Sequence, residues 1–187
     1  MVMIRVVASV VHLEARRASH AQLVVHSSGT YPSAAHHPDL VGAVVAIDAP
    51  LLPPEALASL IPAFVEGLRS PAYQDVARGF VSNMLFLPTD DPKRKTQIVE
   101  HMATAPQHVM FSAMECIFRC DTADSAARCK APALLINAAA PLADLDRLRE
   151  ACPQVMIGQT VGAGHFNQLE VPDQVNAMIE RFMQVSL

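Results

Sequence analysis

A serine follows directly after a short apolar segment and stands where the chain must turn sharply. Residues 23–25 are apolar without alternation, which is typical of a strand buried on both faces of a parallel sheet. Ser27 follows, and a side chain at such a turn is held at the carboxyl end of the sheet, where open α/β sheets bind ligands. Ser27 is therefore a candidate nucleophile, and the backbone N–H of Ser28 is a candidate donor to a developing oxyanion. The alternative is a polar turn whose serines cap a helix.

A histidine near the other end of the chain could activate this serine. His165 lies in the loop after the last strand candidate, flanked by Gly162 and Gly164, which let the loop bend and leave space beside the imidazole. Histidine is the usual general base for a serine hydroxyl because its pKa lies near neutrality. Of the eight histidines, His165 has the best context for this chemistry. The alternative is a histidine that packs against or caps the last helix.

The elements that would position these residues alternate between strands and helices. Four strands are predicted, at residues 22–25, 41–47, 131–137 and 154–161. Between the second and third strands, about eighty residues have only helical character, and in them Asp91 is predicted to cap a helix that begins at Pro92.

Further helices are expected at both ends of the chain and after the third strand. They are predicted at residues 4–18, in a short segment after Gly29, at 141–152, and from about Pro172 to the end. Val175, Met178, Ile179 and Phe182 form the apolar face of the last one. The predicted fold class is α/β, with a mostly parallel sheet of about four strands and an inserted helical segment.

Composition excludes several classes of function. The chain of 187 residues is 51% hydrophobic and 17% charged, with a net charge of −4. A basic patch is absent from the sequence, which argues against nucleic acid and anionic membranes as partners. No apolar stretch reaches the roughly 18 residues of a spanning helix. The four cysteines match no zinc or disulfide pattern, so reduced, buried thiols in a cytoplasmic protein are expected.

Two parts of the chain resemble the α/β-hydrolase family. The stretches "VVHSSG" and "HHPDLVGAVVAIDAP" resemble its nucleophile elbow and next strand, although Val25 replaces the first glycine of the G-x-S-x-G pattern. The stretches "APALLIN" and "VGAGHFNQLEVPDQVNAMIERF" resemble its last third. The resemblance implies that Ser27 is the nucleophile and His165 its base. It also implies a hydrolase core at residues 1–49 and 129–187, with a helical cap at 50–128.

The resemblance leaves two positions open for the catalytic acid. Family members usually carry it after the strand that follows the cap, where Ala140 and Pro141 stand and Asp144 comes a few residues later. Other members carry it after the strand that follows the elbow, where Asp48 lies. Asp48 is favoured over Asp144 because the loop after Asn137 is filled by alanine and proline. The acid would fix the imidazole tautomer and stabilise the imidazolium.

The function that the resemblance implies is carboxylic-ester hydrolysis through an acyl-enzyme, with a small apolar ester as substrate and without a metal or organic cofactor. The chain opens at the helix before the elbow, whereas family members carry earlier strands and a second oxyanion donor there. Lacking one such donor typically costs about 10²–10³ in rate, so low activity is expected. The alternative is a catalytically impaired fragment, or a small-molecule binding protein that uses the cap pocket. A homodimer is expected to cover the edge of the strand at 22–25.

Overall fold

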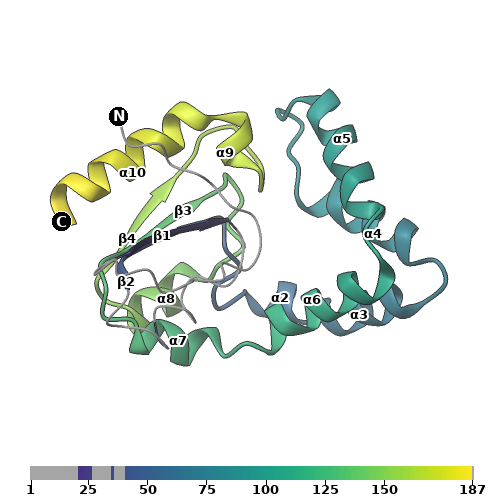
Figure 1. The fold of residues 1–187 in the computed structure, drawn as a ribbon, viewed down its shortest axis with the longest axis horizontal. Helices are drawn as coiled ribbons and strands as arrows, with labels where there is room; N and C mark the ends of the chain where they lie inside the picture. Colours follow the sequence, from purple (N-terminus) through teal and green to yellow (C-terminus); the bar gives the residue numbers. More distant parts are fainter. Residues whose placement is uncertain (1–20, 27–34, 36–40, 187) are drawn as a thin grey trace.

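The computed structural model describes residues 21–26, 35 and 41–186, and its centre is a parallel sheet (Figure 1). The sheet has four strands in the order β1-β2-β3-β4. They are β1 (Ala21–His26), β2 (Val41–Ile47), β3 (Ala133–Asn137) and β4 (Val155–Gln159). All three neighbouring pairs are parallel, so the carboxyl ends of the strands meet at one edge.

The predicted α/β class and sheet are confirmed. The third strand starts at Ala133 rather than residue 131, because Pro132 has no N–H to donate, although its carbonyl accepts from Val44 N. The first strand lies at one edge of the described sheet, and its pairing with a second copy stays a prediction. The predicted helix at 4–18 and the helical segment after Gly29 lie outside the described residues.

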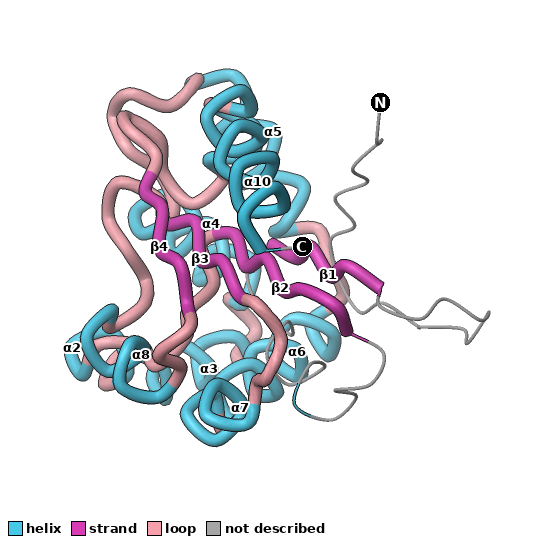
Figure 2. Tube along the Cα trace, turned by 90° about the vertical axis from the view of Figure 1, so that its left-hand side faces the viewer, coloured by secondary structure: helices cyan, strands magenta, loops and turns pink. Residues whose placement is uncertain are grey.

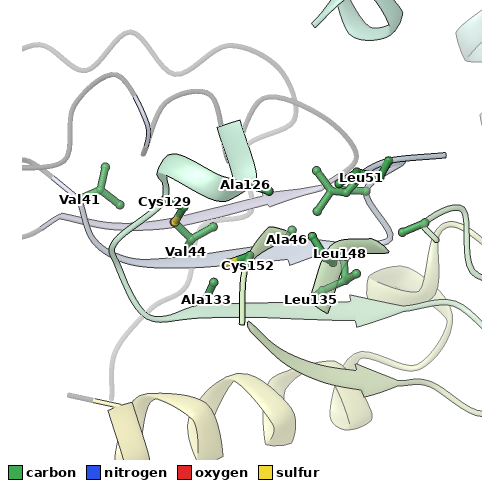
Figure 3. Packing of buried hydrophobic residues seen from close by; sticks show 13 residues of the cluster. Val41, Val44, Ala46, Leu51, Ala126, Cys129, Ala133, Leu135, Leu148 and Cys152 are labelled. Atoms are coloured by element: carbon green, nitrogen blue, oxygen red, sulfur yellow. The ribbon is translucent and has the colours of Figure 1, made fainter. Parts of the chain in front are cut away.

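Helices cover both faces of the sheet, as expected for buried parallel strands (Figure 2). Side chains of β2 alternate between the faces, with Val44 and Ala46 on one and Val45 and Ile47 on the other. On the first face they pack with α7 (Thr122–Arg128) and α8 (Leu145–Ala151), as Figure 3 shows. On the second face they pack with α10 (Pro172–Ser186), whose buried residues Val175, Ile179 and Phe182 belong to the predicted apolar face.

Residues 48–132, all of them described, form helices and no strand, as predicted. The helices are α2 (Glu55–Ala58), α3 (Ile61–Arg69), α4 (Tyr73–Met84), α5 (Pro92–Ala103), α6 (Gln107–Arg119) and α7. Figure 1 shows α3, α4, α5 and α6 grouped beside the sheet, whereas α7, which was not predicted, returns to cover it. No helix among the described residues is both long enough and apolar enough to cross a membrane.

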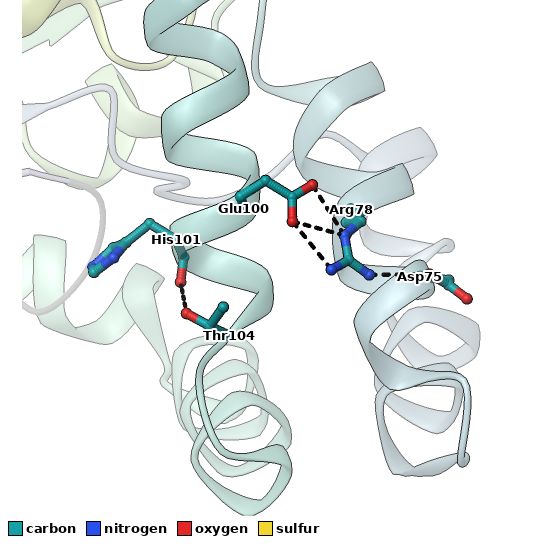
Figure 4. Close-up of polar contacts among 5 residues, drawn as sticks. All are labelled: Asp75, Arg78, Glu100, His101 and Thr104. Atoms are coloured by element: carbon teal, nitrogen blue, oxygen red, sulfur yellow. Dashed lines mark hydrogen bonds and ion pairs between the residues drawn. The ribbon is translucent and has the colours of Figure 1, made fainter.

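The helices α4 and α5 contact each other through buried apolar side chains and, on the solvent side, through an ion pair. Val81 and Val99 belong to one buried cluster between the two helices. On the outside, the Arg78 guanidinium donates to both Glu100 oxygens at 3.1–3.3 Å, and this hydrogen bond raises the pKa of Arg78 (Figure 4). Exposed ion pairs contribute little to stability, so the buried cluster holds these helices together.

Local capping determines where two of the helices begin. Asp91 accepts from the backbone N–H groups of Lys93 and Arg94 and caps α5, as predicted. Asp144 accepts from Arg147 N and caps α8 in the same way. The predicted helix at 141–152 was therefore too long at its start, because its cap lies three residues further along the chain.

The expectation of four buried thiols was wrong. All four cysteines are free, but only Cys129 and Cys152 are buried, whereas Cys116 is exposed and Cys120 is half-buried. The last two lie on or directly after α6, a helix without fully buried residues. A hydrogen bond between the two buried thiols lowers the pKa of Cys129 to about 7 and raises the pKa of Cys152.

We predict that access, and not thiolate content, orders the reactivity of these cysteines. Native protein treated with iodoacetamide should be modified first at Cys116 and then at Cys120, with peptide mass spectrometry as the measurement. Although its pKa is lowered to about 7, Cys129 should stay unmodified until urea unfolds the chain, because the sheet and two helices cover it. Modification of Cys129 as fast as that of Cys116 would contradict this packing.

Candidate functional site

A buried carboxylate stands at the carboxyl end of β2. Asp48 follows Ile47 directly, is 1% exposed and has a φ of 42°, in the left-handed region that Asp tolerates better than most residues. Its backbone N–H donates to Ile136 O at 2.7 Å, which continues the hydrogen bonding between β2 and β3 by one residue. The positive φ turns the chain out of the sheet at this point.

Both carboxylate oxygens of Asp48 are engaged. Oδ1 accepts from the backbone N–H of Ala138 at 2.8 Å, and Oδ2 lies 2.7 Å from Nδ1 of His165. An Nδ1–H that donates to a carboxylate leaves the lone pair of the imidazole on Nε2, where a general base needs it. The backbone donor on Oδ1 holds the carboxylate in place for this contact.

The loop after β4 carries His165 to this carboxylate. Residues 160–166 form this histidine loop, in which Gly162 has a φ of 72° and supplies the turn. The carbonyl of Ala163 accepts from Ala139 N at 3.0 Å, so the loop is fastened to the end of β3. The backbone N–H of His165 donates to Leu85 O at 2.9 Å, and its ring meets Phe166 edge-on.

The other acid that the sequence left open does not meet the histidine. The Asp144 carboxylate accepts from Arg147 N and caps α8, while Ala140 and Leu142 line the pocket beside His165. The carboxylate in contact with His165 is that of Asp48. The catalytic roles of both residues stay predictions.

The candidate nucleophile Ser27 and the candidate oxyanion donor Ser28 lie outside the described residues. The strand that precedes them, β1, is described, and its pairing with β2 shows at which edge of the sheet it ends. His26, the last residue of β1, is aligned with Ile47, the residue before Asp48. The connection that contains Ser27 therefore begins at the edge of the sheet where Asp48 stands.

A small pocket opens beside the His165–Asp48 pair. Apart from these two residues its lining is mainly apolar and comes from the end of α4, the residues after it, and the loop after β3. The lining residues are Met84, Leu85, Phe86, Leu87, Ala138, Ala140, Leu142 and Gly164. In the described part of the chain, no three His, Cys, Asp or Glu side chains are grouped so that they could hold a metal ion.

Among known proteins, the matches found are solved structures with a similar fold. No model of a known protein family matches the sequence, and no curated protein matches it. The fold is similar to that of the enol-lactonase from Burkholderia xenovorans LB400, at a TM-score of 0.73 and 16% identity over 89% of this chain and 66% of the lactonase. An esterase from Thermogutta terrifontis matches at a TM-score of 0.73 and 19% identity over 90% of this chain and 66% of the esterase. The chain has the α/β-hydrolase fold.

A hydrolase from Oleispira antarctica gives a similar match, with a TM-score of 0.73 and 14% identity over 87% of this chain and 64% of the other. The chain thus spans about two thirds of the length of the solved structures it resembles. At these identities the likeness shows the α/β-hydrolase fold and leaves activity to the site itself.

Sequence reasoning missed one buried group of the site. Asp90 is 7% exposed and accepts from the backbone N–H of Gly164, directly before His165. It stands next to Asp91, whose capping role the pattern "TDDP" does predict. Nothing in the local pattern separates these two carboxylates, because the partner of Asp90 in the histidine loop, Gly164, lies 74 residues away.

We predict that Asp48 and Asp144 differ in what they contribute to stability. Asp48→Asn should lower the free energy of unfolding by about 1–3 kcal/mol, because its amide NH₂ cannot accept from Ala138 N–H or His165 Nδ1–H. Asp144→Asn should change it by less than about 0.5 kcal/mol, because asparagine caps helices as well as aspartate does. Urea unfolding of both variants measures this, and equal losses would contradict the pairing of Asp48 with His165.

Proposed function

We propose that this protein is a serine hydrolase that cleaves carboxylic esters through an acyl-enzyme on Ser27. The observation that carries the proposal is the buried contact of 2.7 Å between His165 Nδ1 and Asp48 Oδ2. Each residue follows a different strand of the sheet, and β1 ends at the same edge with His26, the residue before Ser27 in the sequence. The fold-level likeness adds that two solved structures of this fold are named an enol-lactonase and an esterase, and both names denote cleavage of carboxylic esters.

In the proposed reaction, Ser27 Oγ attacks the ester carbonyl carbon while His165 Nε2 takes the hydroxyl proton. The tetrahedral intermediate collapses when its C–O bond to the alcohol breaks, and the imidazolium gives its proton to the leaving alkoxide oxygen. A water molecule then attacks the acyl carbon and loses a proton to His165 Nε2. The bond between the acyl carbon and Ser27 Oγ breaks, the imidazolium returns its proton to Oγ, and the carboxylic acid and free Ser27 result. Asp48 holds the imidazole in the tautomer that this sequence needs and stabilises the imidazolium.

The developing negative charge on the carbonyl oxygen needs donors. The proposal assigns one of them to the backbone N–H of Ser28, the residue after the nucleophile, as in the nucleophile-elbow pattern. No metal or organic cofactor takes part in these steps. Each covalent bond formed or broken belongs to the ester, to Ser27, to His165 or to water.

The proposed substrate is a small ester with an apolar group. A second pocket, of about 190 Å³, lies among α2, α3, α4 and α6, and its lining is entirely apolar: Leu57, Leu60, Ile61, Phe64, Phe80, Met84 and Phe118. Met84 lines this pocket and also the one beside His165. A dry cavity of about 150 Å³ is enough for benzene, so this pocket suits a ring or a chain of about six carbons. In this proposal the helices of residues 50–128 act as the cap of the active site.

The apolar pocket also supports a second candidate function, which is the binding of a small apolar molecule without turnover. The described residues of its lining include neither Asp48 nor His165. Calorimetry would measure the binding of hexanoate to Ser27→Ala protein. Such binding, together with a wild type that hydrolyses no ester, would favour this second function.

We predict that ester hydrolysis depends on Ser27 and His165 as a unit. Ser27→Ala, His165→Ala and the double variant should each lose about 10³-fold or more in kcat on p-nitrophenyl butyrate, with similar residual rates, because neither group works without the other. A fluorophosphonate probe should label the wild type and not Ser27→Ala. Ser112→Ala, an exposed serine of α6, serves as the matched control and should behave as the wild type. Losses that add up in the double variant would contradict a shared mechanism.

We predict that the apolar pocket sets the preferred chain length. Hexanoate esters should have kcat/KM values about 10- to 100-fold above those of acetate esters, because each buried methylene contributes up to about 0.8 kcal/mol. Ile61→Trp fills the pocket and should reduce this preference without affecting acetate, whereas Val109→Trp, on the exposed side of α6, should not. An unchanged preference in Ile61→Trp would place the acyl group elsewhere.

A further inference from the structure

The segment that joins α4 to α5 is hydrogen-bonded to the histidine loop. This α4–α5 connection comprises residues 85–91 and lies in the helical part of the chain, far in sequence from residues 160–166. The backbone N–H of His165 donates to Leu85 O at 2.9 Å, and that of Gly164 donates to Asp90 Oδ1 at 2.9 Å. Two consecutive amides of the loop thus find their acceptors in the helical part.

Asp90 is the centre of this contact. Its second oxygen, Oδ2, accepts from Leu87 N at 2.7 Å, so one buried carboxylate bridges the α4–α5 connection and the histidine loop. A second bridge lies beside it, because Glu170 Oε2 accepts from Asp91 N at 3.1 Å and pairs with Arg94 at 2.7 Å. The first bridge ends on the histidine loop, and the second ends on α9 (Asn167–Glu170), which follows that loop.

The approach of the two segments is so close that residue 164 must be glycine. A Cβ at Gly164 would lie 2.5 Å from Asp90 Oδ2 and 2.8 Å from Leu85 O. The Leu85 contact is to backbone, which cannot move aside as a flexible side chain could. Glycine at this position therefore lets the carboxylate reach the loop amide.

From this geometry we propose that Asp90 is a positioning residue, which holds the backbone of the histidine loop so that the His165 imidazole stays in line with Asp48. The proposal rests on the proposed function for its effect on rate, but not for its effect on the imidazole. Asp90 does not line the pocket beside His165, so it acts through the loop and not on substrate. The Asp48 carboxylate holds the His165 ring, while the Leu85 carbonyl and the Asp90 carboxylate hold the loop backbone at His165 and Gly164. The helical part of the chain thereby controls the geometry of the base.

The test compares Asp90→Asn with Asp91→Asn. The first variant replaces an acceptor oxygen with an NH₂ group, so either Gly164 N–H or Leu87 N–H loses its acceptor. The second makes the same change of charge one residue away, where asparagine still caps α5 and the histidine loop is not touched. Proton NMR follows the far-downfield Nδ1–H resonance expected for a histidine that donates to a buried carboxylate. Steady-state kinetics on p-nitrophenyl butyrate follow turnover.

Asp90→Asn should broaden or abolish this resonance and lower kcat about 10- to 100-fold with KM changed less than about threefold, because small displacements of a catalytic group cost rates of this order. Asp91→Asn should match the wild type in both measurements. A folded Asp90→Asn protein that keeps the resonance and kcat would overturn the proposal. If the wild type itself hydrolyses no ester, the proposed function fails, and the resonance alone then decides the role of Asp90.

A second variant covers the case in which Asp90→Asn does not fold, as judged by circular dichroism. Asp90→Ser removes the carboxylate without placing an NH₂ group against the amides of Gly164 and Leu87, and its single hydroxyl oxygen on a shorter side chain cannot serve both amides. It should give the same effects on the resonance and kcat as Asp90→Asn. Both quantities unchanged in folded Asp90→Ser protein would likewise overturn the proposal.

Discussion

The contact between Asp48 and His165 can form only if distant parts of the chain are held in a fixed arrangement. The two residues are 117 positions apart in the chain, yet their side chains meet at 2.7 Å in a place where they are 1% and 8% exposed. Buried polar groups are costly unless they are hydrogen-bonded, so neither side chain could be placed there alone. The parallel sheet provides this arrangement, because it brings the end of β2 and the loop after β4 to one edge.

Two layers of apolar contacts, one on each face of the sheet, keep the strands aligned with one another. The helices α7 and α8 cover one face of the sheet and α10 covers the other, so β2 and β3 are buried on both sides. Ala46 and Ala43 of β2 belong to the two buried clusters, one on each face. Close-packed interiors resist a shift of a strand by even one residue, and such a shift would carry Asp48 away from His165.

The helical part of the chain contributes contacts to the candidate site. Its α4–α5 connection supplies the acceptors for the amides of Gly164 and His165 and also walls the pocket beside the imidazole. In the same part, the rings of Phe64 and Phe80 are stacked with their centroids 4.1 Å apart, and both rings line the apolar pocket. The same part of the chain therefore hydrogen-bonds to the histidine loop and lines the apolar pocket.

The sequence by itself determined the features that depend on near neighbours. Apolar runs without alternation predicted the buried strands, the Asp91-Pro92 pair predicted the start of α5, and the order of motifs predicted the α/β-hydrolase fold. Among the acids, the pattern favoured Asp48, and only the tertiary structure showed its contact with His165, while Asp144 caps a helix. Packing also decided which cysteines are buried, where α7 returns to the sheet, and that Asp90 rather than Asp91 reaches the histidine loop. Periodicity and capping act over a few residues, whereas burial and hydrogen bonds between distant segments arise only when the whole chain has packed.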